Sequence, residues 1–151
     1  MNSPNLSPRA AVGSHPIYSM LAAFPAVCFT LTLATDIAYW QTANLMWQRF
    51  AEWLLLVGTV VGAVAVLVGA IARIVRSRSY VERPTSLHLL GNVVVLVLAV
   101  VNSLVHARDG WTGVVPEGLI LSAVTVAVMI LTAWIGHAII VRHQAGVRHY
   151  A

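Results

Sequence analysis

Histidines are the residues of this chain best suited to chemistry, and four of the six lie near one set of ends of long apolar runs. These four are His15, His88, His137 and His143. Neutral imidazole binds iron, copper and zinc, and histidines on facing helices hold haem b in membrane electron-transfer proteins. We therefore expect haem b at these helix ends, with a transition-metal or proton site as one alternative and no cofactor as another.

The preferred axial pair for haem is His88 with His143, because each lies on the polar stripe of its predicted span. His15 is the third candidate ligand, and His137 is an alternative ligand. Without a cofactor, the same rings would face lipid headgroups or form hydrogen bonds between helices.

A second polar group lies at the opposite ends of the runs and consists of Asp36, Asn102 and His106. Burying a carboxylate is costly unless it is hydrogen-bonded, so these residues are expected to pair with one another. We interpret them as a structural polar cluster, and a proton relay through them is the alternative.

The elements that position these residues are four helices long enough to cross a membrane. The predicted spans cover about 16–39, 52–75, 85–107 and 117–142, and each reaches the roughly 20 residues that the hydrocarbon layer requires. Hydrophobic residues make up 59% of the chain and charged residues only 9%. The sequence predicts an all-α integral membrane protein, an up-down-up-down four-helix bundle over 15–147, with a flexible leader at 1–14 and a tail at 148–151.

Charge distribution predicts the orientation of the bundle. Seven arginines lie on one side of the spans and two, Arg49 and Arg108, on the other; the seven are Arg9, Arg73, Arg76, Arg78, Arg83, Arg142 and Arg148. The positive-inside rule therefore places both termini in the cytoplasm and the loops near 41–49 and 108–116 outside. Because the basic residues sit in these connections, we expect no nucleic-acid binding.

Small residues on the second span predict close helix packing. Gly58, Gly62 and Gly69 share one face at helical spacing, which lets two backbones approach. A packing seam within the chain is the preferred interpretation, and a homo-oligomer seam is the alternative. In the first span, Pro25 is expected to kink the helix.

Known catalytic motifs are absent from the sequence. It has no phosphate-binding glycine loop, no H-E-x-x-H motif and no serine or cysteine nucleophile next to a base. We therefore expect no enzyme activity beyond, at most, that of a membrane redox subunit. A transporter or channel is disfavoured because no pair of broken helices and no ring of charge is evident.

Several short motifs follow one another in a fixed order along the chain. They are His15-Pro16, Phe24-Pro25, Asp36, a segment from Trp47 to Gly69, His88 with Asn92, and Trp134-Ile135-Gly136 leading into Val141-Arg142-His143 and Gly146-Val147. In this order and spacing the chain resembles an uncharacterised family of four-span bacterial membrane proteins, a domain of unknown function found alone or fused to Rieske iron–sulfur domains. The resemblance covers nearly all of the chain after the leader.

This resemblance implies a multi-pass protein of the bacterial plasma (inner) membrane in an electron-transfer context. A second glycine would be expected after Gly136, where this chain has His137, so the resemblance favours His15, His88 and His143 as the family-like set. The expected function is a haem-b-binding electron-transfer subunit, and the alternative is a non-catalytic structural or assembly subunit of a membrane complex. The expected partners are the lipid bilayer and a redox or membrane-complex protein.

Overall fold

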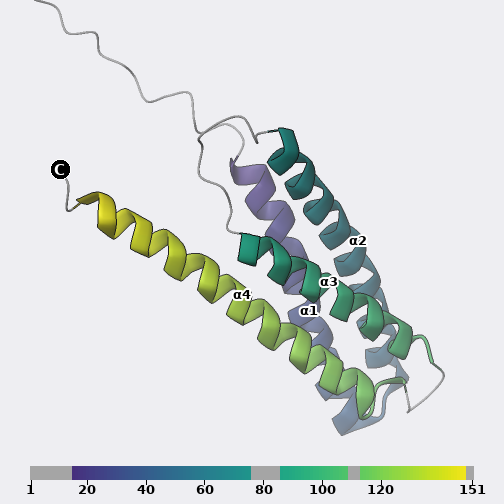
Figure 1. The fold of residues 1–151 in the computed structure, drawn as a ribbon. Helices are drawn as coiled ribbons and strands as arrows, with labels where there is room; N and C mark the ends of the chain where they lie inside the picture. The colour runs from purple at the N-terminus through teal and green to yellow at the C-terminus, as the bar shows by residue number, and fades with distance from the viewer. Residues whose placement is uncertain (1–14, 76–85, 109–112, 149–151) are drawn as a thin grey trace, which may run out of the picture.

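The fold consists of four α-helices and the short connections between them (Figure 1). A computed structural model describes residues 15–75, 86–108 and 113–148, with side chains described at 23–71, 74, 89–108 and 113–138. The helices are α1 (His15–Thr42), α2 (Leu45–Val75), α3 (Ser86–His106) and α4 (Glu117–Arg148). The predicted all-α four-helix architecture is confirmed, whereas the predicted leader and the last three residues lie outside the described residues.

Apolar side chains face outward on every helix, as they do in a protein whose solvent is lipid. Leu67 on α2, Leu104 on α3 and Trp134 on α4 are exposed by 61%, 67% and 71%. All four helices are long and apolar enough to cross a bilayer, with candidate spans Ala23–Thr42, Leu45–Ile71, Leu89–His106 and Glu117–Ala138. The chain is a multi-pass membrane protein.

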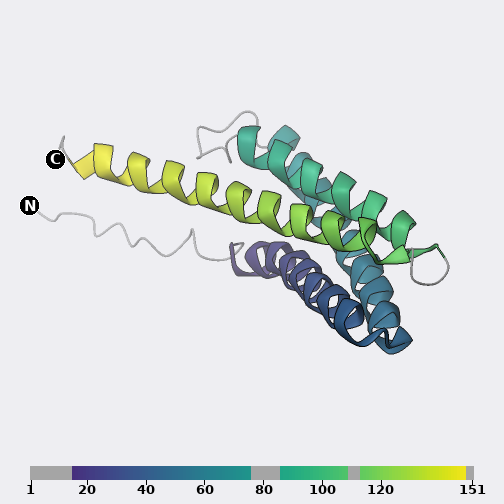
Figure 2. The ribbon, with the colours of Figure 1, turned by 90° about the horizontal axis from the view of Figure 1, so that it is seen from below.

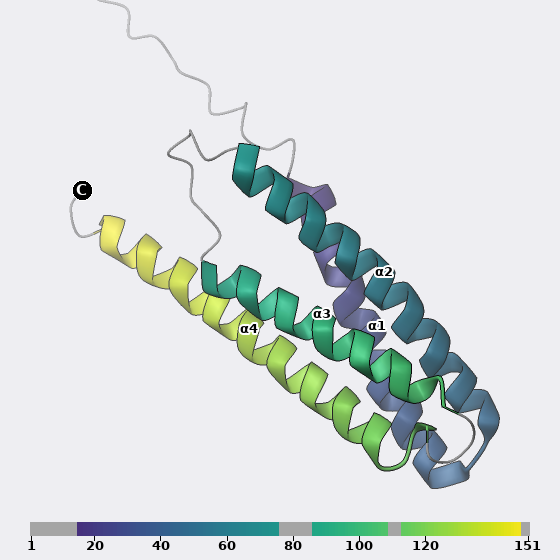
Figure 3. The same cartoon turned by 45° about the vertical axis from the view of Figure 1, so that its right-hand side comes forward.

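Sequential helices pack side by side, and α4 returns to pack against α1 (Figure 3). The apolar core draws one small cluster from the first three helices, namely Phe29, Leu55, Val95 and Ala99, with Val128 and Met129 of α4 packed against it. Two buried threonine hydroxyls are satisfied within their own helices: Thr32 Oγ1 donates to the Cys28 carbonyl at 3.0 Å and Thr125 Oγ1 to the Leu121 carbonyl at 2.7 Å. Such local bonds let threonine enter an apolar interior at low cost.

The connection between α1 and α2 is a two-residue turn. Ala43 has a φ of 51° and its N–H donates to the Tyr39 carbonyl at 2.7 Å, which ends α1 in the left-handed conformation. Asn44 then caps α2, because its Oδ1 accepts from the Met46 N–H at 3.0 Å. The helix therefore begins at Leu45, earlier than the predicted span start at 52, and most of the loop predicted near 41–49 is helical.

Glycines at the helix seams pack against neighbouring helices of the same chain. A Cβ on Gly58 would lie 2.8 Å from Cys28 Cβ and 2.9 Å from Phe29 Cε1, so α1 and α2 can approach only because this position has no side chain. Gly62 faces Leu96 and Pro25 with ordinary contact distances, and α1 continues as a helix through Pro25. Gly69 is half-buried.

The end of α4 separates from the rest of the bundle. Figures 1 and 2 show its C-terminal part extending past the start of α3 and away from α1. Thr132 is the last buried residue described on this helix, and residues 133–138, more than one full turn, are exposed or half-buried on every side. Because four antiparallel helices bring both chain ends to one side, we call the side of the α1 N-terminus the inner end; its cytoplasmic location remains a prediction.

Candidate functional site: a buried polar cluster at the outer end

Asp36 is a fully buried carboxylate in the last two turns of α1. Its side chain has 0% exposure. An isolated buried charge would be prohibitively unfavourable, so the neighbours of this group decide whether the helix can pack here at all.

The first neighbour is His106, the last residue of α3. Its Nε2 lies 2.9 Å from Asp36 Oδ1, and its Nδ1 lies 3.0 Å from the carbonyl oxygen of Asn102 one turn earlier. A carbonyl can only accept, so Nδ1 carries a proton and donates. Nε2 then either donates to an ionised Asp36 or accepts from a protonated one, and in both cases the pair is electrically neutral.

Ser122 of α4 completes the coordination of the carboxylate. Its Oγ donates to Asp36 Oδ2 at 2.5 Å and accepts from Asn102 Nδ2 at 2.8 Å. Asp36, Asn102, His106 and Ser122 are each exposed by 1% or less. We call these four residues the Asp36 cluster; it joins α1, α3 and α4 by side-chain hydrogen bonds.

The geometry of the cluster differs from that of a hydrolytic triad. In such a triad the serine hydroxyl gives its proton to histidine, whereas here it donates to the carboxylate. Both nitrogens of His106 are already engaged, by Asp36 and by the Asn102 carbonyl. The arrangement can share and move protons, but it does not activate the Ser122 hydroxyl as a nucleophile.

A glycine at the start of α4 makes room for the His106 ring. A Cβ on Gly118 would lie 2.7 Å from His106 Cε1 and 2.7 Å from the carbonyl oxygen of Gly113, distances that real side chains do not adopt. The segment before α4 thus lies close to His106, and Val114 in this segment is fully buried. This segment contains a cis peptide between Val115 and Pro116 and ends near an exposed ion pair, Arg108 with Glu117 at 2.6 Å.

Three of the four members of the Asp36 cluster, namely Asp36, Asn102 and His106, are among the site residues predicted from the sequence. The structure brings the predicted Asp36 and His106 into direct contact and links Asn102 to Asp36 through Ser122. Ser122 and Gly118 were not predicted as site residues. Ser122 could have been found from its place on the polar face of the fourth span. No sequence pattern marks Gly118, because its role depends on how two helices meet.

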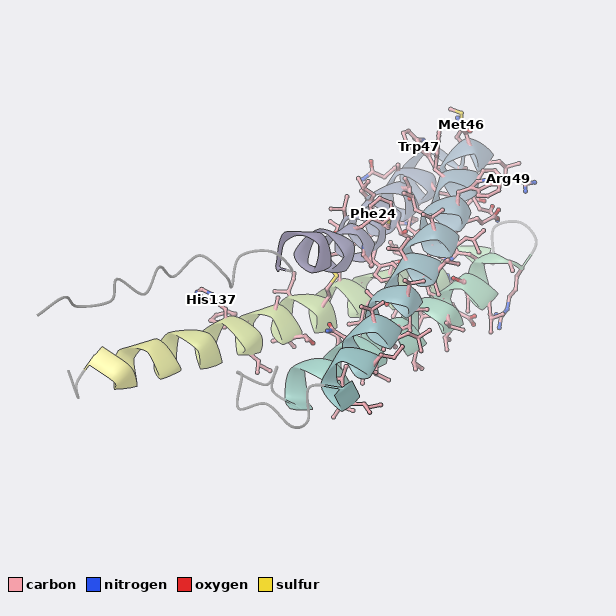
Figure 4. The ribbon with its side chains drawn as sticks, turned by 90° about the horizontal axis from the view of Figure 1, so that it is seen from above. Phe24, Met46, Trp47, Arg49 and His137 are labelled. Carbon is pink, nitrogen blue, oxygen red and sulfur yellow. The ribbon has the colours of Figure 1, made fainter. Side chains whose placement is uncertain are left out.

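The predicted haem ligands lie at the other end of the bundle, mostly outside the described side chains. The side chains of His15, His88 and His143 are not among those described. His137, the alternative ligand, is described and exposed, and Figure 4 shows it on the part of α4 that has left the bundle. Among the described side chains, no group of three or more His, Cys, Asp or Glu residues could hold a metal ion.

The backbone register fixes the depths of these three histidines. Gly91 of α3 faces Thr132 of α4, so the backbone of His88 is level with Ile135 and roughly 12 Å along the axis from His143 at about 1.5 Å per residue. Asp36 of α1 meets Ser122 of α4, and His15 and His143 are equally many residues from this contact; the two helices diverge toward the inner end, so the count does not bring them together.

A comparison with known protein families identifies the chain. The family described as "Predicted membrane protein (DUF2231)" matches residues 14–149, nearly the whole sequence. No curated protein and no solved structure matches the chain. The match agrees with the resemblance to a four-span membrane family of unknown function. The chain belongs to the DUF2231 family of predicted membrane proteins.

Proposed function

We propose that this protein is a non-catalytic structural or assembly subunit of a complex in the bacterial plasma membrane. The observation that carries the proposal is the exposed inner part of α4, residues 133–138, in a helix whose outer part is firmly held. Exposed side chains on a helix inside the apolar layer offer a surface to another protein.

The outer end of α4 is held by polar contacts inside the bundle. Ser122 contacts Asp36 of α1 and Asn102 of α3, and Gly91 of α3 accommodates Thr132 ten residues further along α4. Removing a buried partner would leave uncompensated polar groups, so these helices stay together at this end. The part of α4 beyond Thr132 therefore projects from a fixed base.

The projecting part of α4 carries side chains suited to protein contact. Trp134 is exposed by 71% and Ile135 by 39%, and His137 follows one turn after Trp134. Tryptophan supplies large contact area in interfaces, and small residues such as Ala133 and Gly136 allow a partner helix to come close. Lipid alone would cover such a surface equally well, and this is the outcome that the experiment must separate from partner binding.

The experiment is photo-crosslinking from a single introduced cysteine in native membranes. Cys28, the only native cysteine, is first replaced by alanine; His137→Cys is then labelled with benzophenone maleimide. Leu67→Cys on α2 is the matched control, since Leu67 is 61% exposed. The two positions are matched in depth by backbone count along antiparallel helices. Leu67 is counted from the contact of Gly58 with Cys28 and His137 from the contact of Ser122 with Asp36, and both counts lead to residues 19–21 of α1.

A discrete protein adduct from position 137, and none from position 67, is the expected result. Mass spectrometry of the adduct then distinguishes a second copy of this chain, the homo-oligomer alternative, from a different membrane or redox protein. Lipid adducts alone from both positions would refute the proposal.

Haem b binding is the second candidate function, and the helix register bears on its ligands. Two axial imidazoles must approach one iron from opposite sides, so their helices must carry them close together and at a similar depth. His88 and His143 are offset by about two turns. The inner part of α4, the helix of His143, extends away from α1, the helix of His15. We therefore keep His15, His88 and His143 together as candidate ligands and single out no pair.

Absorption spectra of the purified protein test this candidate. After expression with ample haem, the oxidised and dithionite-reduced protein should show a Soret band that is lost in at least two of the variants His15→Ala, His88→Ala and His143→Ala. The control His137→Ala should retain the band. A wild-type protein without a Soret band would exclude the haem function and leave the structural proposal standing.

A further inference from the structure

We propose that the Asp36 cluster is a proton-binding site, which takes up one proton on the Asp36 carboxylate by reversing the direction of its hydrogen-bond chain. This inference is independent of the proposed function, because the cluster lies at the outer end of the bundle and the exposed part of α4 at the inner end. The ligand is a single proton from the solution at the outer surface.

Of the two protonation states that the geometry allows, we assign the ionised Asp36 to the resting state. Asp36 Oδ1 faces the Nε2 of His106 and Asp36 Oδ2 faces the hydroxyl of Ser122, so a carboxylate here accepts from both. The Nδ1–H of His106 donates to the Asn102 carbonyl, which leaves the ring with two donated protons as an imidazolium. The resting pair is then a carboxylate and an imidazolium joined by a charge-assisted bond.

Asn102 allows the hydrogen-bond chain to run in a second direction. In the resting state its Nδ2 donates to Ser122 Oγ, while its Oδ1 is buried without a partner among the described residues. If the amide turns over, Oδ1 takes the place of Nδ2 and becomes an acceptor for the Ser122 hydroxyl. Amide oxygen and nitrogen are nearly equal in size and shape, so the turn requires no repacking.

Proton uptake then proceeds without loss of a hydrogen bond. The incoming proton forms an O–H bond at Asp36 Oδ2, which now donates to Ser122 Oγ; Ser122 in turn donates to Asn102 Oδ1. His106 keeps both of its protons and still donates to Asp36 Oδ1. Each direction of the chain leaves one amide atom of Asn102 unpaired, so the two directions contain equal numbers of bonds.

The charged and titratable groups near the cluster, among the described residues, lie on α1, on α2 and at the two ends of the connection between α3 and α4. Besides Asp36, α1 contributes the buried Tyr39 one turn nearer the outer surface. On α2, Glu52 is 29% exposed, bonded to Gln48 Nε2 at 3.2 Å and paired with Arg49 at 3.7 Å, and it acts electrostatically on His106. The Arg108–Glu117 pair is exposed near the start of α4, and Ser122 is the contribution of α4 itself.

Glu52 has two roles in this arrangement. Its negative charge offsets the extra positive charge that the cluster gains on proton uptake, which makes a charged state tolerable next to the apolar layer. Because its side chain is partly exposed, it also connects the level of His106 with the outer solution. These features identify the outer surface as the side from which the proton arrives.

The test is difference infrared spectroscopy of the full chain in lipid nanodiscs, acidified from about pH 9 to about pH 4, a range that brackets shifted carboxyl groups. A protonated carboxylic acid gives a carbonyl band that a carboxylate lacks. The wild type should gain such a band on acidification, and Asp36→Asn should lack the part of it that belongs to Asp36. Asp36→Asn folds because an amide can donate to a neutral His106 and still accept from Ser122.

Two further variants separate the cluster from the other acidic groups of the chain. Ser122→Ala removes the hydroxyl that bonds to Asp36 Oδ2, so the frequency of the Asp36 band should change. Glu117→Gln, at an exposed carboxylate, should leave the Asp36 band unchanged. A wild-type band that is absent, independent of pH, or retained in Asp36→Asn would overturn the proposal.

Discussion

Replacing Asp36 by alanine should destabilise the bundle far more than replacing it by asparagine. Alanine removes the acceptors of both the His106 ring and the Ser122 hydroxyl, and leaves these groups unpaired at 1% exposure or less. Asparagine has nearly the same shape and can donate to a neutral His106 while accepting from Ser122. Asparagine therefore keeps the volume and most of the hydrogen bonds of Asp36, and alanine keeps neither.

The size of the effect follows from the number of lost bonds. Breaking a buried pair by removing one partner costs about 3–5 kcal/mol in soluble proteins. Interhelical hydrogen bonds in membranes average only about 0.6 kcal/mol, because the unfolded helices remain in apolar surroundings and find other partners. Two bonds are lost here, one of them to a charged group. We therefore expect Asp36→Ala to lower the free energy of unfolding by about 3 kcal/mol and Asp36→Asn by about 1 kcal/mol or less.

Unfolding in mixed micelles of a mild detergent and dodecyl sulfate measures this difference, with the fluorescence of the five tryptophans as the signal. Equal stabilities for the two variants would show that the hydrogen bonds that asparagine can still make at this position do not stabilise the bundle. An unchanged stability in Asp36→Ala would refute the idea that the cluster holds α1, α3 and α4 together.

Three other substitutions test the structure at single positions by the same assay. Gly118→Ala should cost about 1–3 kcal/mol, because its Cβ would press on the His106 ring and on the Gly113 carbonyl; an unchanged stability would contradict this packing. Ala43→Gly should add about 1 kcal/mol, since glycine adopts the positive φ of the turn without strain, and a loss would mean that the turn differs. Glu117→Gln should change stability by less than about 1 kcal/mol, because its pair with Arg108 is exposed by 58% on both sides; a larger loss would mean that the pair is buried by something else in the membrane.

The sequence predicts those structural features that depend on one helix alone. Long uncharged runs predict the four helices, and the cost of burying a carboxylate predicts that Asp36 finds polar partners such as His106. The predicted second span starts later than α2 does, because the uncharged run begins only after Arg49 and Glu52. In the structure these charges sit one turn apart on the helix and pair with each other at 3.7 Å, so they support the helix instead of ending it.

Features that depend on how two helices meet could not be predicted from periodicity. Ser122 is one of several hydroxyl residues on its helix, and only the depth at which α4 meets α1 selects it as the partner of Asp36. The same reason limits the haem prediction: polar stripes place His88 and His143 on suitable faces, but the contact of Gly91 with Thr132 shows that their backbones lie at different depths. Helical faces follow from one sequence segment, whereas relative depth follows from packing.

His106 is locked between Asp36 and the Asn102 carbonyl inside the bundle. Nitrogen NMR of histidine-labelled protein in nanodiscs detects this arrangement, with His137 as the reference for an exposed ring. We predict that the Nδ1–H of His106 persists and exchanges slowly with solvent between about pH 5 and pH 8. A His106 Nδ1–H that exchanges as fast as a ring N–H of His137 would show that the ring is not held in this way.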